Sequence, residues 1–255
     1  MNDAELIAVW EHEEQQPFVG WDFSYLDGRK QEEPPPLHYE LRAAKLMQHA
    51  QSVLDLDTGG GERLLAFRPH WPATLTATEG YPPNVRLATE RLAPLGVRVV
   101  EVESNETAVL PFSDASFGLV LNRHGGSMHI AEIARVLTPG GTFLTQQVHG
   151  QTLLDLLMLF SATPPWPDAT PARYLPLIAH AGLEVVAVRE YSGAETFADV
   201  GALVYFLKAI PWLVPDFSVA THTAPLLALH ARVGRGEPLR FTTRGYLIEA
   251  HKLIE

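Results

Sequence analysis

The composition of this 255-residue chain indicates one sizeable globular domain and excludes several kinds of chemistry. Hydrophobic residues make up 46% of it, enough for one large core but few for two. It has no cysteine, which excludes disulfides, thiolate metal ligands and a cysteine nucleophile. With 30 acidic and 19 basic residues, a net charge of −11, it lacks the broad cationic surface that polyanion binding usually requires, so nucleic acid is not expected as a partner.

The sequence shows no sign of export or membrane insertion. The first residues, MNDAELIAVWEHEEQQ, are acidic and lack the basic start and apolar core of a signal peptide, so we expect a cytoplasmic protein. The most apolar stretch, residues 197–215, is interrupted by Asp199, Lys208 and Pro211, which is wrong for a membrane span. We expect a buried or partner-facing helix there.

The predicted elements alternate along most of the chain. Two helices, at 3–15 and 38–50, flank a loop whose glycines and prolines deny it regular structure. Short β-rich runs then alternate with helical patterns, which is typical of βαβ units and a mainly parallel sheet. Two further helices within 193–237 interrupt the alternation before the last strand. The predicted strands lie at 52–56, 73–78, 96–102, 117–122, 142–148, 184–191 and 245–251, and the helices between them at 62–68, 82–93, 128–137, 150–160 and 171–181.

The segment VLDLDTGGG, residues 53–61, places a glycine-rich turn at the carboxyl end of the first of these strands. Ligands bind at this position in open parallel sheets, because the following helix presents unpaired N–H groups. A dinucleotide fingerprint would need a third glycine where Leu64 stands, and no lysine follows to make a P-loop. A pyrophosphate near Asp55, Asp57 and Glu62 would meet like charge, at a cost of several kcal/mol at about 4 Å. The acidity favours a positively charged ligand.

Three later segments extend this pattern. The second strand ends in ATEG (77–80), which puts Glu79 beside the glycine turn, where a carboxylate accepts the hydroxyls of a ribose. LPFSDASF (110–117) and EIARVLTPGG (132–141) follow the third and fourth strand regions. With these motifs in this order and spacing, residues 50 to 148 resemble the class I S-adenosylmethionine-dependent methyltransferases, especially the branch of the ubiquinone and menaquinone biosynthesis enzymes.

The resemblance implies S-adenosylmethionine as cofactor, S-adenosylhomocysteine as product, and an α/β Rossmann-like fold. The fold is a seven-stranded, mainly parallel sheet with its last strand antiparallel, helices on both faces and a helical insertion before the last strand. The chain would be a single methyltransferase domain. Within it, residues 1–50 would form a helical cap, 51–192 and 238–255 the core, and 193–237 an insertion or lid.

The resemblance also implies which residues bind the cofactor. Asp55 would orient the loop, and the glycines would let the backbone approach the methionine moiety. Glu79 would take the ribose hydroxyls, with the two residues after it near the adenine. The complete implied set is Asp55, Asp57, Gly59, Gly60, Gly61, Glu79, Gly80, Tyr81, Glu106, Thr107, Asn122 and Arg123.

The later members of this set have distinct implied roles. Glu106 stands where the family usually has an aspartate directed at the adenine amino group, and Thr107 would offer its backbone N–H. Asn122 and Arg123, just past the fourth strand, would flank the sulfonium and the acceptor. Gly118 stands where the family has an aspartate, a further departure from its pattern.

Asp57 is the most consequential departure, because it occupies the first glycine of the family's GxGxG. If the position needs a positive φ, an L-residue is strained by about 1–2 kcal/mol, although Asp tolerates it better than most. A carboxylate about 4 Å from an ammonium or sulfonium could gain a few kcal/mol before desolvation. Alternatively, since positions 55 and 57 of a strand face the same side, Asp57 would crowd Asp55 and raise the pKa of one of them.

The acceptor side is defined less sharply. Methyl transfer is an in-line attack, and a general base is needed only for a nucleophile whose proton has a high pKa. His124 is the first candidate for such a base, and no histidine spacing predicts a metal site. The aromatic residues Trp10, Trp21, Tyr25 and Tyr205 either line an apolar acceptor pocket or belong to the core. Other candidates for the cleft are His129, Gln146, Gln147, His149 and Tyr39.

The predicted function is methyl transfer to a small, apolar or aromatic molecule. The segment NRHG at 122–125 differs from the Asn/Asp-Pro-Pro-aromatic turn common in enzymes that methylate nucleic-acid bases, which disfavours such substrates. One alternative is an RNA or protein methyltransferase that uses a local basic patch, at Arg123 or at Arg232 to Arg240. Another is a non-catalytic S-adenosylmethionine-binding module, suggested by Asp57 and Gly118.

Overall fold

The chain folds into two compact units. The computed structural model describes residues 2–18, 22–36, 39–126 and 128–254. Unit 1 comprises Met1–Pro35, His149–Asp168 and Tyr191–Arg244, and unit 2 comprises Pro36–Val148, Ala169–Glu190 and Gly245–Glu255. The predicted division into cap, core and lid stays a prediction.

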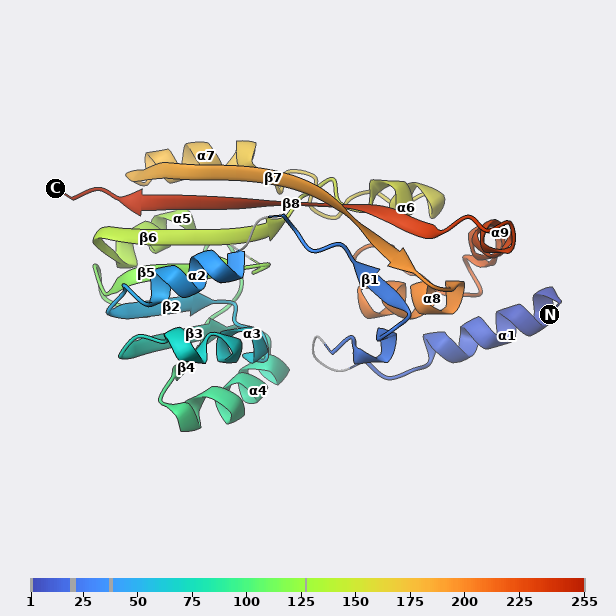
Figure 1. Ribbon diagram of the computed structural model, residues 1–255, viewed down its shortest axis with the longest axis horizontal. Helices are drawn as coiled ribbons and strands as arrows, with labels where there is room; N and C mark the ends of the chain where they lie inside the picture. Colours follow the sequence, from blue (N-terminus) through green and yellow to red (C-terminus); the bar gives the residue numbers. More distant parts are fainter. Residues whose placement is uncertain (1, 19–21, 37–38, 127, 255) are drawn as a thin grey trace. The chain divides into compact units, whose positions relative to one another are not determined.

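Unit 2 contains the mainly parallel sheet that the sequence predicts (Figure 1). Parallel pairs join β2 to β3, β3 to β4, β2 to β5 and β5 to β6. The last strand, β8, pairs antiparallel with β6, which confirms the predicted reversal. The bounds are β2 (Ser52–Leu56), β3 (Thr74–Glu79), β4 (Arg98–Glu101), β5 (Phe117–Arg123), β6 (Leu137–Val148), β7 (Leu183–Phe197) and β8 (Leu239–Lys252).

The predicted count of seven strands is wrong, because the sheet has eight strands within the described residues, in the order β1-β7-β8-β6-β5-β2-β3-β4. The added strand, β1 (Lys30–Glu32), pairs antiparallel with the far end of β7. It reads KQE and lies in the loop region before the sheet, so it carries no apolar alternation by which a strand is recognised. β7 continues to Phe197 and β8 begins at Leu239, both beyond their predicted limits.

Helices cover both faces of the sheet in unit 2, as predicted. Neighbouring strand residues point to opposite faces, so Val53 and Leu54 enter different apolar clusters. One cluster receives Ile133 from α5 and Ile178 from α7, and the other receives residues of α2, α3 and α4. The helices are α2 (Tyr39–Met47), α3 (Glu62–Ala66), α4 (Pro82–Leu92), α5 (Ile130–Val136) and α7 (Pro171–His180), with short 3₁₀ helices at Arg68–His70 and Ala93–Leu95.

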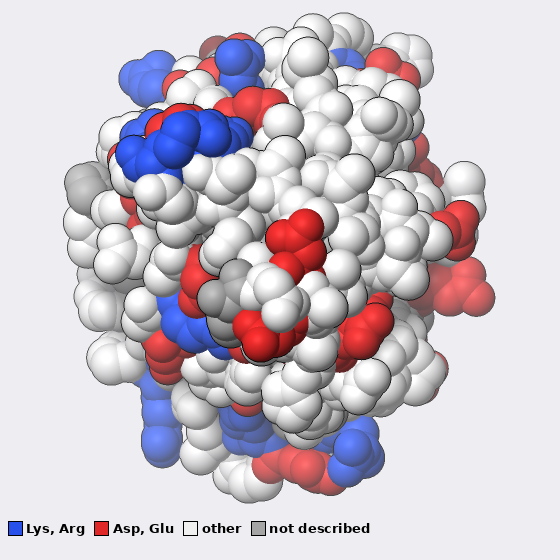
Figure 2. Space-filling view, turned by 90° about the vertical axis from the view of Figure 1, so that its right-hand side faces the viewer, with Lys and Arg blue, Asp and Glu red and all other residues white. Residues whose placement is uncertain are grey.

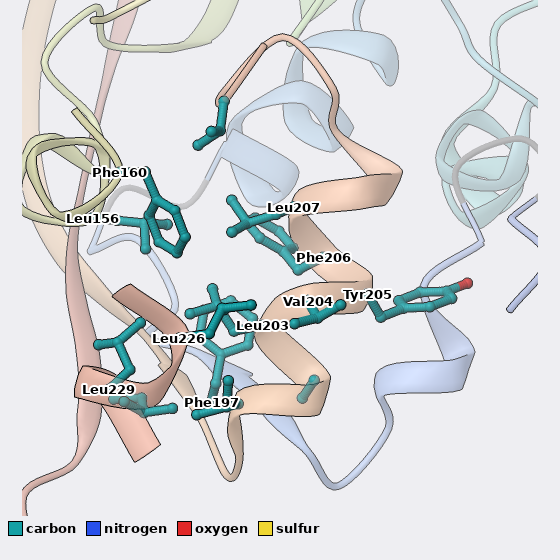
Figure 3. Packing of buried hydrophobic residues seen from close by; sticks show 14 of the residues in the cluster. Leu156, Phe160, Phe197, Leu203, Val204, Tyr205, Phe206, Leu207, Leu226 and Leu229 are labelled. Atoms are coloured by element: carbon teal, nitrogen blue, oxygen red, sulfur yellow. The ribbon is translucent and has the colours of Figure 1, made fainter. Parts of the chain in front are cut away.

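Unit 1 is built around α8 (Val200–Ala209), a helix buried on nearly all sides. Leu203, Phe206 and Leu207 pack against Leu156 and Phe160 and residues of α9 (Figure 3). The predicted buried helix within 197–215 is thus confirmed. No helix in the described parts of the chain is both long and apolar enough to span a bilayer. The other helices of unit 1 are α1 (Asp3–Glu14), α6 (Leu154–Leu159), α9 (Thr223–Gly234) and the 3₁₀ turn Ser24–Leu26.

An arginine ties α1 to the start of α8 in unit 1. Arg29 Nη2 lies 2.9 Å from Glu13 Oε1 and 2.8 Å from Asp199 Oδ1, and Asp199 caps α8 by accepting from the backbone of Ala202. Removing the cation leaves two carboxylates facing each other, partly desolvated. We expect Arg29→Met to lower the free energy of unfolding by about 1–3 kcal/mol in urea denaturation.

Arg240 provides the matched control for this substitution. Its partner is Glu33, and both side chains are about half exposed. An exposed ion pair contributes little, so Arg240→Met should change the free energy of unfolding by less than about 0.5 kcal/mol. Equal effects of the two substitutions would contradict the role given to Arg29.

Candidate functional site

The candidate site lies at the carboxyl ends of β2, β3 and β5 in unit 2, which meet at one edge because these strands are parallel. The loop after β2 turns through left-handed conformations, with φ of +55° at Asp57, +63° at Gly59 and +82° at Gly61. Glycine adopts such values without strain. At Gly61 a Cβ would also lie 2.8 Å from Leu92 Cδ1 on α4. The loop therefore requires glycine there for both its conformation and its packing.

Glu79 joins the end of β3 to this loop. Its side chain is buried, only 5% exposed. Oε2 accepts a hydrogen bond from the backbone N–H of Gly59 at 2.7 Å, and Oε1 accepts from Gly80 and Tyr81, both at 2.9 Å. A carboxylate offers about four acceptor positions. Three bonds leave capacity for a hydroxyl donor from a ligand.

Asp57 directs its carboxylate across the strand ends. Oδ1 accepts a hydrogen bond from the Ser104 hydroxyl, and Oδ2 lies 3.4 Å from Asn122 Nδ2. A Cβ at Gly125 would overlap both the Asn122 amide and the same Oδ2, so the missing side chain at 125 makes room for this pair. At Gly118, another departure from the family pattern, packing does not require a glycine. A Cβ there would make only ordinary contact, 3.7 Å from Ser52 O.

Asn122 is held by a buried polar network across β5 and β6. It is fully buried, and its Oδ1 accepts a hydrogen bond from Gln147 Nε2. Gln147 also donates to Thr145 Oγ1 at 2.9 Å. Buried polar groups need such partners, and these bonds leave the Asn122 amide nitrogen turned towards Leu56 O and Asp57.

A second group of polar side chains comes from α2, α3 and the end of β5. Arg63 pairs with Glu40 at 2.6 Å, and Arg123 lies 3.9 Å from the same carboxylate and donates to Gln146 Oε1 at 2.8 Å. Tyr39 is buried in this region, and burial together with the charge of Asp55 raises the pKa of its hydroxyl. Sequence reasoning missed Arg63 and Glu40, because they come from helices that no motif connects.

Asp55 is expected to make stability depend on pH. Burial raises the pKa of its carboxyl to about 7, and the charges of Asp57 and Glu79 add to the shift. Burial is the main cause of this shift, and the charge of Asp57 acts in the direction that the sequence predicts. The native state holds the proton between pH 4 and pH 7, whereas the unfolded chain does not, so stability falls as pH rises through this window.

We expect the free energy of unfolding to fall by about 2–3 kcal/mol between pH 5 and pH 8, with Asp55→Asn removing most of this fall. Thermal unfolding of the two proteins across this range measures the difference. An Asp55→Asn protein with the same pH dependence as the wild type would contradict the assignment.

Two predicted residues lie away from the others. Glu106 Oε2 lies 2.5 Å from Arg173 Nη2, and Tyr174 of α7 donates to its other oxygen at 3.4 Å. The backbone N–H of Thr107 is bonded to Asn105 Oδ1 at 2.9 Å. Instead, Glu103 and Asn105 line a small cavity at the strand ends, together with Asp57, Thr78, Leu110 and His129.

The candidate general base, His124, stands at the rim of the site. It is exposed, with a φ of +54° and its backbone N–H bonded to Gln146 O. Partial desolvation and the positive charges of Arg123 and Arg63 lower the pKa of the imidazole. A base is most effective when its pKa lies near the working pH, so the lowered pKa counts against His124 as the general base, and its role stays a prediction.

The other candidates mostly have structural partners. His129 Nδ1 lies 2.6 Å from Ala108 O, and His149, in unit 1, accepts at Nδ1 from the backbone of Gln151. Trp10 and Tyr205 belong to the apolar core of unit 1, as the alternative interpretation had it. Tyr25 lies with its ring 4.5 Å from that of Tyr205. Trp21 is outside the described residues.

Comparisons with known proteins agree with this fold. Residues 53–141 match the family model of the methyltransferase domain. The phthiotriol/phenolphthiotriol dimycocerosates methyltransferase of Mycobacterium tuberculosis is 28% identical over 152 residues, which cover 56% of this chain and 53% of that protein. The fatty-acid O-methyltransferase of Mycolicibacterium smegmatis is 32% identical over 114 residues, covering 42% and 40%. The chain thus spans about half the length or less of these relatives.

A solved structure extends the likeness to more of the chain. A protein from Bacillus halodurans, described as a candidate methyltransferase, superimposes with a TM-score of 0.58 at 17% identity, covering 84% of this chain and 96% of that one. At this identity the likeness concerns the fold alone. The chain shares the α/β fold of that protein over most of its length.

Proposed function

We propose that this protein is an S-adenosylmethionine-dependent methyltransferase that acts on a small, apolar acceptor. The observation that carries the proposal is the arrangement of Glu79, a buried carboxylate bonded to the glycine loop with capacity for a further hydroxyl donor. The methyltransferase domain match over residues 53–141 supports it independently.

The residues present suit this cofactor. Glu79 would hold the ribose, and the left-handed glycines would keep the loop backbone close to the methionine moiety. Asp57 and Glu103 make the surroundings acidic, which favours a cationic ligand. Asn105 and Glu103 line the cavity, so we assign the adenine side to them in place of Glu106. When bound, S-adenosylmethionine supplies a methyl group activated by a positively charged sulfur.

An apolar acceptor is supported by the names of two relatives, a phthiotriol/phenolphthiotriol dimycocerosates methyltransferase and a fatty-acid O-methyltransferase. The resemblance to the ubiquinone and menaquinone branch points to the same class. The low pKa of His124 suits an acceptor atom that is already unprotonated at neutral pH, such as a carboxylate oxygen, because positioning alone can then supply most of the rate.

The alternative of an RNA substrate finds little support in the basic patches. Arg232 and Arg235 both pair with Glu237, and Arg240 pairs with Glu33. On the face shown in Figure 2, Lys and Arg form separate groups with Asp or Glu beside them. RNA binding needs cations available to phosphate. We therefore propose a small-molecule acceptor.

The proposal is tested in two steps. Titration calorimetry should detect binding of S-adenosylmethionine and S-adenosylhomocysteine, and absence of binding to the folded protein would refute it. Transfer of a labelled methyl group is then measured with a fatty acid, a phenolic lipid and total RNA as acceptors. Turnover with a lipid would support the proposal. Turnover only with RNA, falling steeply with salt, would overturn the acceptor class, and binding without any turnover would indicate a binding module.

A further inference from the structure

We propose that Asp57 makes the site select the charged methyl donor over its uncharged product. This inference rests on the proposed function and concerns a residue at which the chain departs from the family pattern. The two ligands share the nucleoside and the amino acid, and they differ in the methyl group and in the positive charge on sulfur. A group that senses this charge would bind the donor and release the product.

The position of Asp57 suits this role. Its carboxylate crosses from the loop after β2 to Ser104, beyond β4, and to Asn122 at the end of β5. It also lines the cavity at the strand ends, with Thr78 and Asn105. The carboxylate thus stands between the loop held by Glu79 and the residue implied to flank the sulfonium.

The electrostatic surroundings of Asp57 favour a cation. Ser104 and Asn122, which orient the carboxylate, are neutral hydrogen-bond donors. Glu103 lines the same cavity, and Glu79 holds the adjacent loop, so two further acids lie at these strand ends. Opposite charges within about 4–6 Å attract strongly in such partly desolvated places.

The loop geometry does not require this side chain. At a φ of +55° an L-residue is strained and glycine is not. A glycine at 57 would relieve this strain. It would not open the space at Gly125, because a Cβ there would also overlap the amide of Asn122. What Asp57 adds to the loop is therefore its charge and its hydrogen bonds, among them those to Ser104 and Asn122.

The decisive variant is Asp57→Asn, which keeps the size of the side chain and removes its charge. Titration calorimetry measures Kd for S-adenosylmethionine and for S-adenosylhomocysteine in each protein. We expect the variant to lose about tenfold in affinity for the donor and less than about threefold for the product. Asp57→Gly should shift the ratio of the two constants in the same direction while raising the melting temperature.

Two controls separate the charge from the geometry. Ser104→Ala removes a partner of Asp57 but keeps its charge, so the ratio should change by less than about threefold. Glu101→Gln, at the exposed end of β4, should leave both constants unchanged. Equal losses for both ligands in Asp57→Asn would overturn the inference and assign Asp57 to the shared amino-acid part. Failure of both ligands to bind the wild type would instead refute the proposed function.

Discussion

Replacing Glu79 with glutamine is expected to weaken binding of S-adenosylmethionine by about 100-fold or more. The substitution removes one of the two carboxylate oxygens that accept hydrogen bonds from the loop and, in the proposed complex, from the ligand. Glu79 accepts from three backbone N–H groups. A glutamine has one oxygen, so its NH₂ group must face at least one of these donors. The glutamine NH₂ and the backbone N–H that it faces are then both donors without an acceptor, at a cost of about 1–3 kcal/mol. The glycine loop should therefore lose its fixed position.

This prediction has two readouts. Titration calorimetry gives the loss of affinity, and thermal unfolding gives the loss of stability. This loss of stability should be smaller than the one caused by a substitution that creates a cavity in the core. Glu101→Gln is the matched control, because Glu101 pairs in register with Glu79 on the neighbouring strand and is exposed. A Glu79→Gln protein that binds the donor as tightly as the control would remove the observation on which the proposed function rests.

The strands and helices were predictable because each carries its own pattern. Each of the seven predicted strands overlaps an observed one, and α4 begins at a proline, which suits a first helical turn. β1 was not predictable, since its three residues are polar and only the partner strand β7 makes them a strand. Local pattern therefore specified the elements that bury apolar side chains, and it missed the one that does not.

The site was predictable where it follows a regular strand. Glu79 ends β3, so its place beside the glycine loop follows from the parallel register of β2 and β3. The loop after β4 is irregular, and its side-chain directions cannot be counted from a period. There the residue lining the cavity is Asn105, while Glu106 turns to Arg173 on α7. A shift of one residue in a loop reverses which side chain faces the ligand.

Two of the sequence motifs act as one structural unit through Arg135. The guanidinium donates to the carbonyl oxygens of Phe112 and Leu110 at 2.7 and 2.9 Å and to both oxygens of Glu132 at 2.7 Å. Glu132 in turn accepts from the backbone N–H of Leu110 at 2.7 Å. The pair thus holds the LPF segment onto α5, and Leu110 lines the cavity.

Arg135→Met should therefore damage both stability and donor binding. It leaves Glu132, whose side chain is 12% exposed, without its cation, and frees two carbonyl groups. Because Arg135 is itself 27% exposed, we expect a loss of about 2–3 kcal/mol in the free energy of unfolding, less than for a fully buried pair. Donor affinity should fall about tenfold or more as the cavity wall loosens. Arg86→Met, which removes an exposed pair with Glu90, should cost less than about 0.5 kcal/mol.

The pH dependence distinguishes a lost ion pair from a simple packing defect. The hydrogen bonds from Arg135 hold the pKa of Glu132 below its usual value. A lowered native pKa stabilises the protein above the unfolded value of about 4.5 and ceases to do so as pH falls through the native value. The difference in unfolding free energy between the wild type and Arg135→Met should therefore narrow as pH falls below about 4.5. A difference that stays constant from pH 7 to pH 3 would show that Arg135 acts through its packing and its bonds to carbonyl groups, and not through the charge of Glu132.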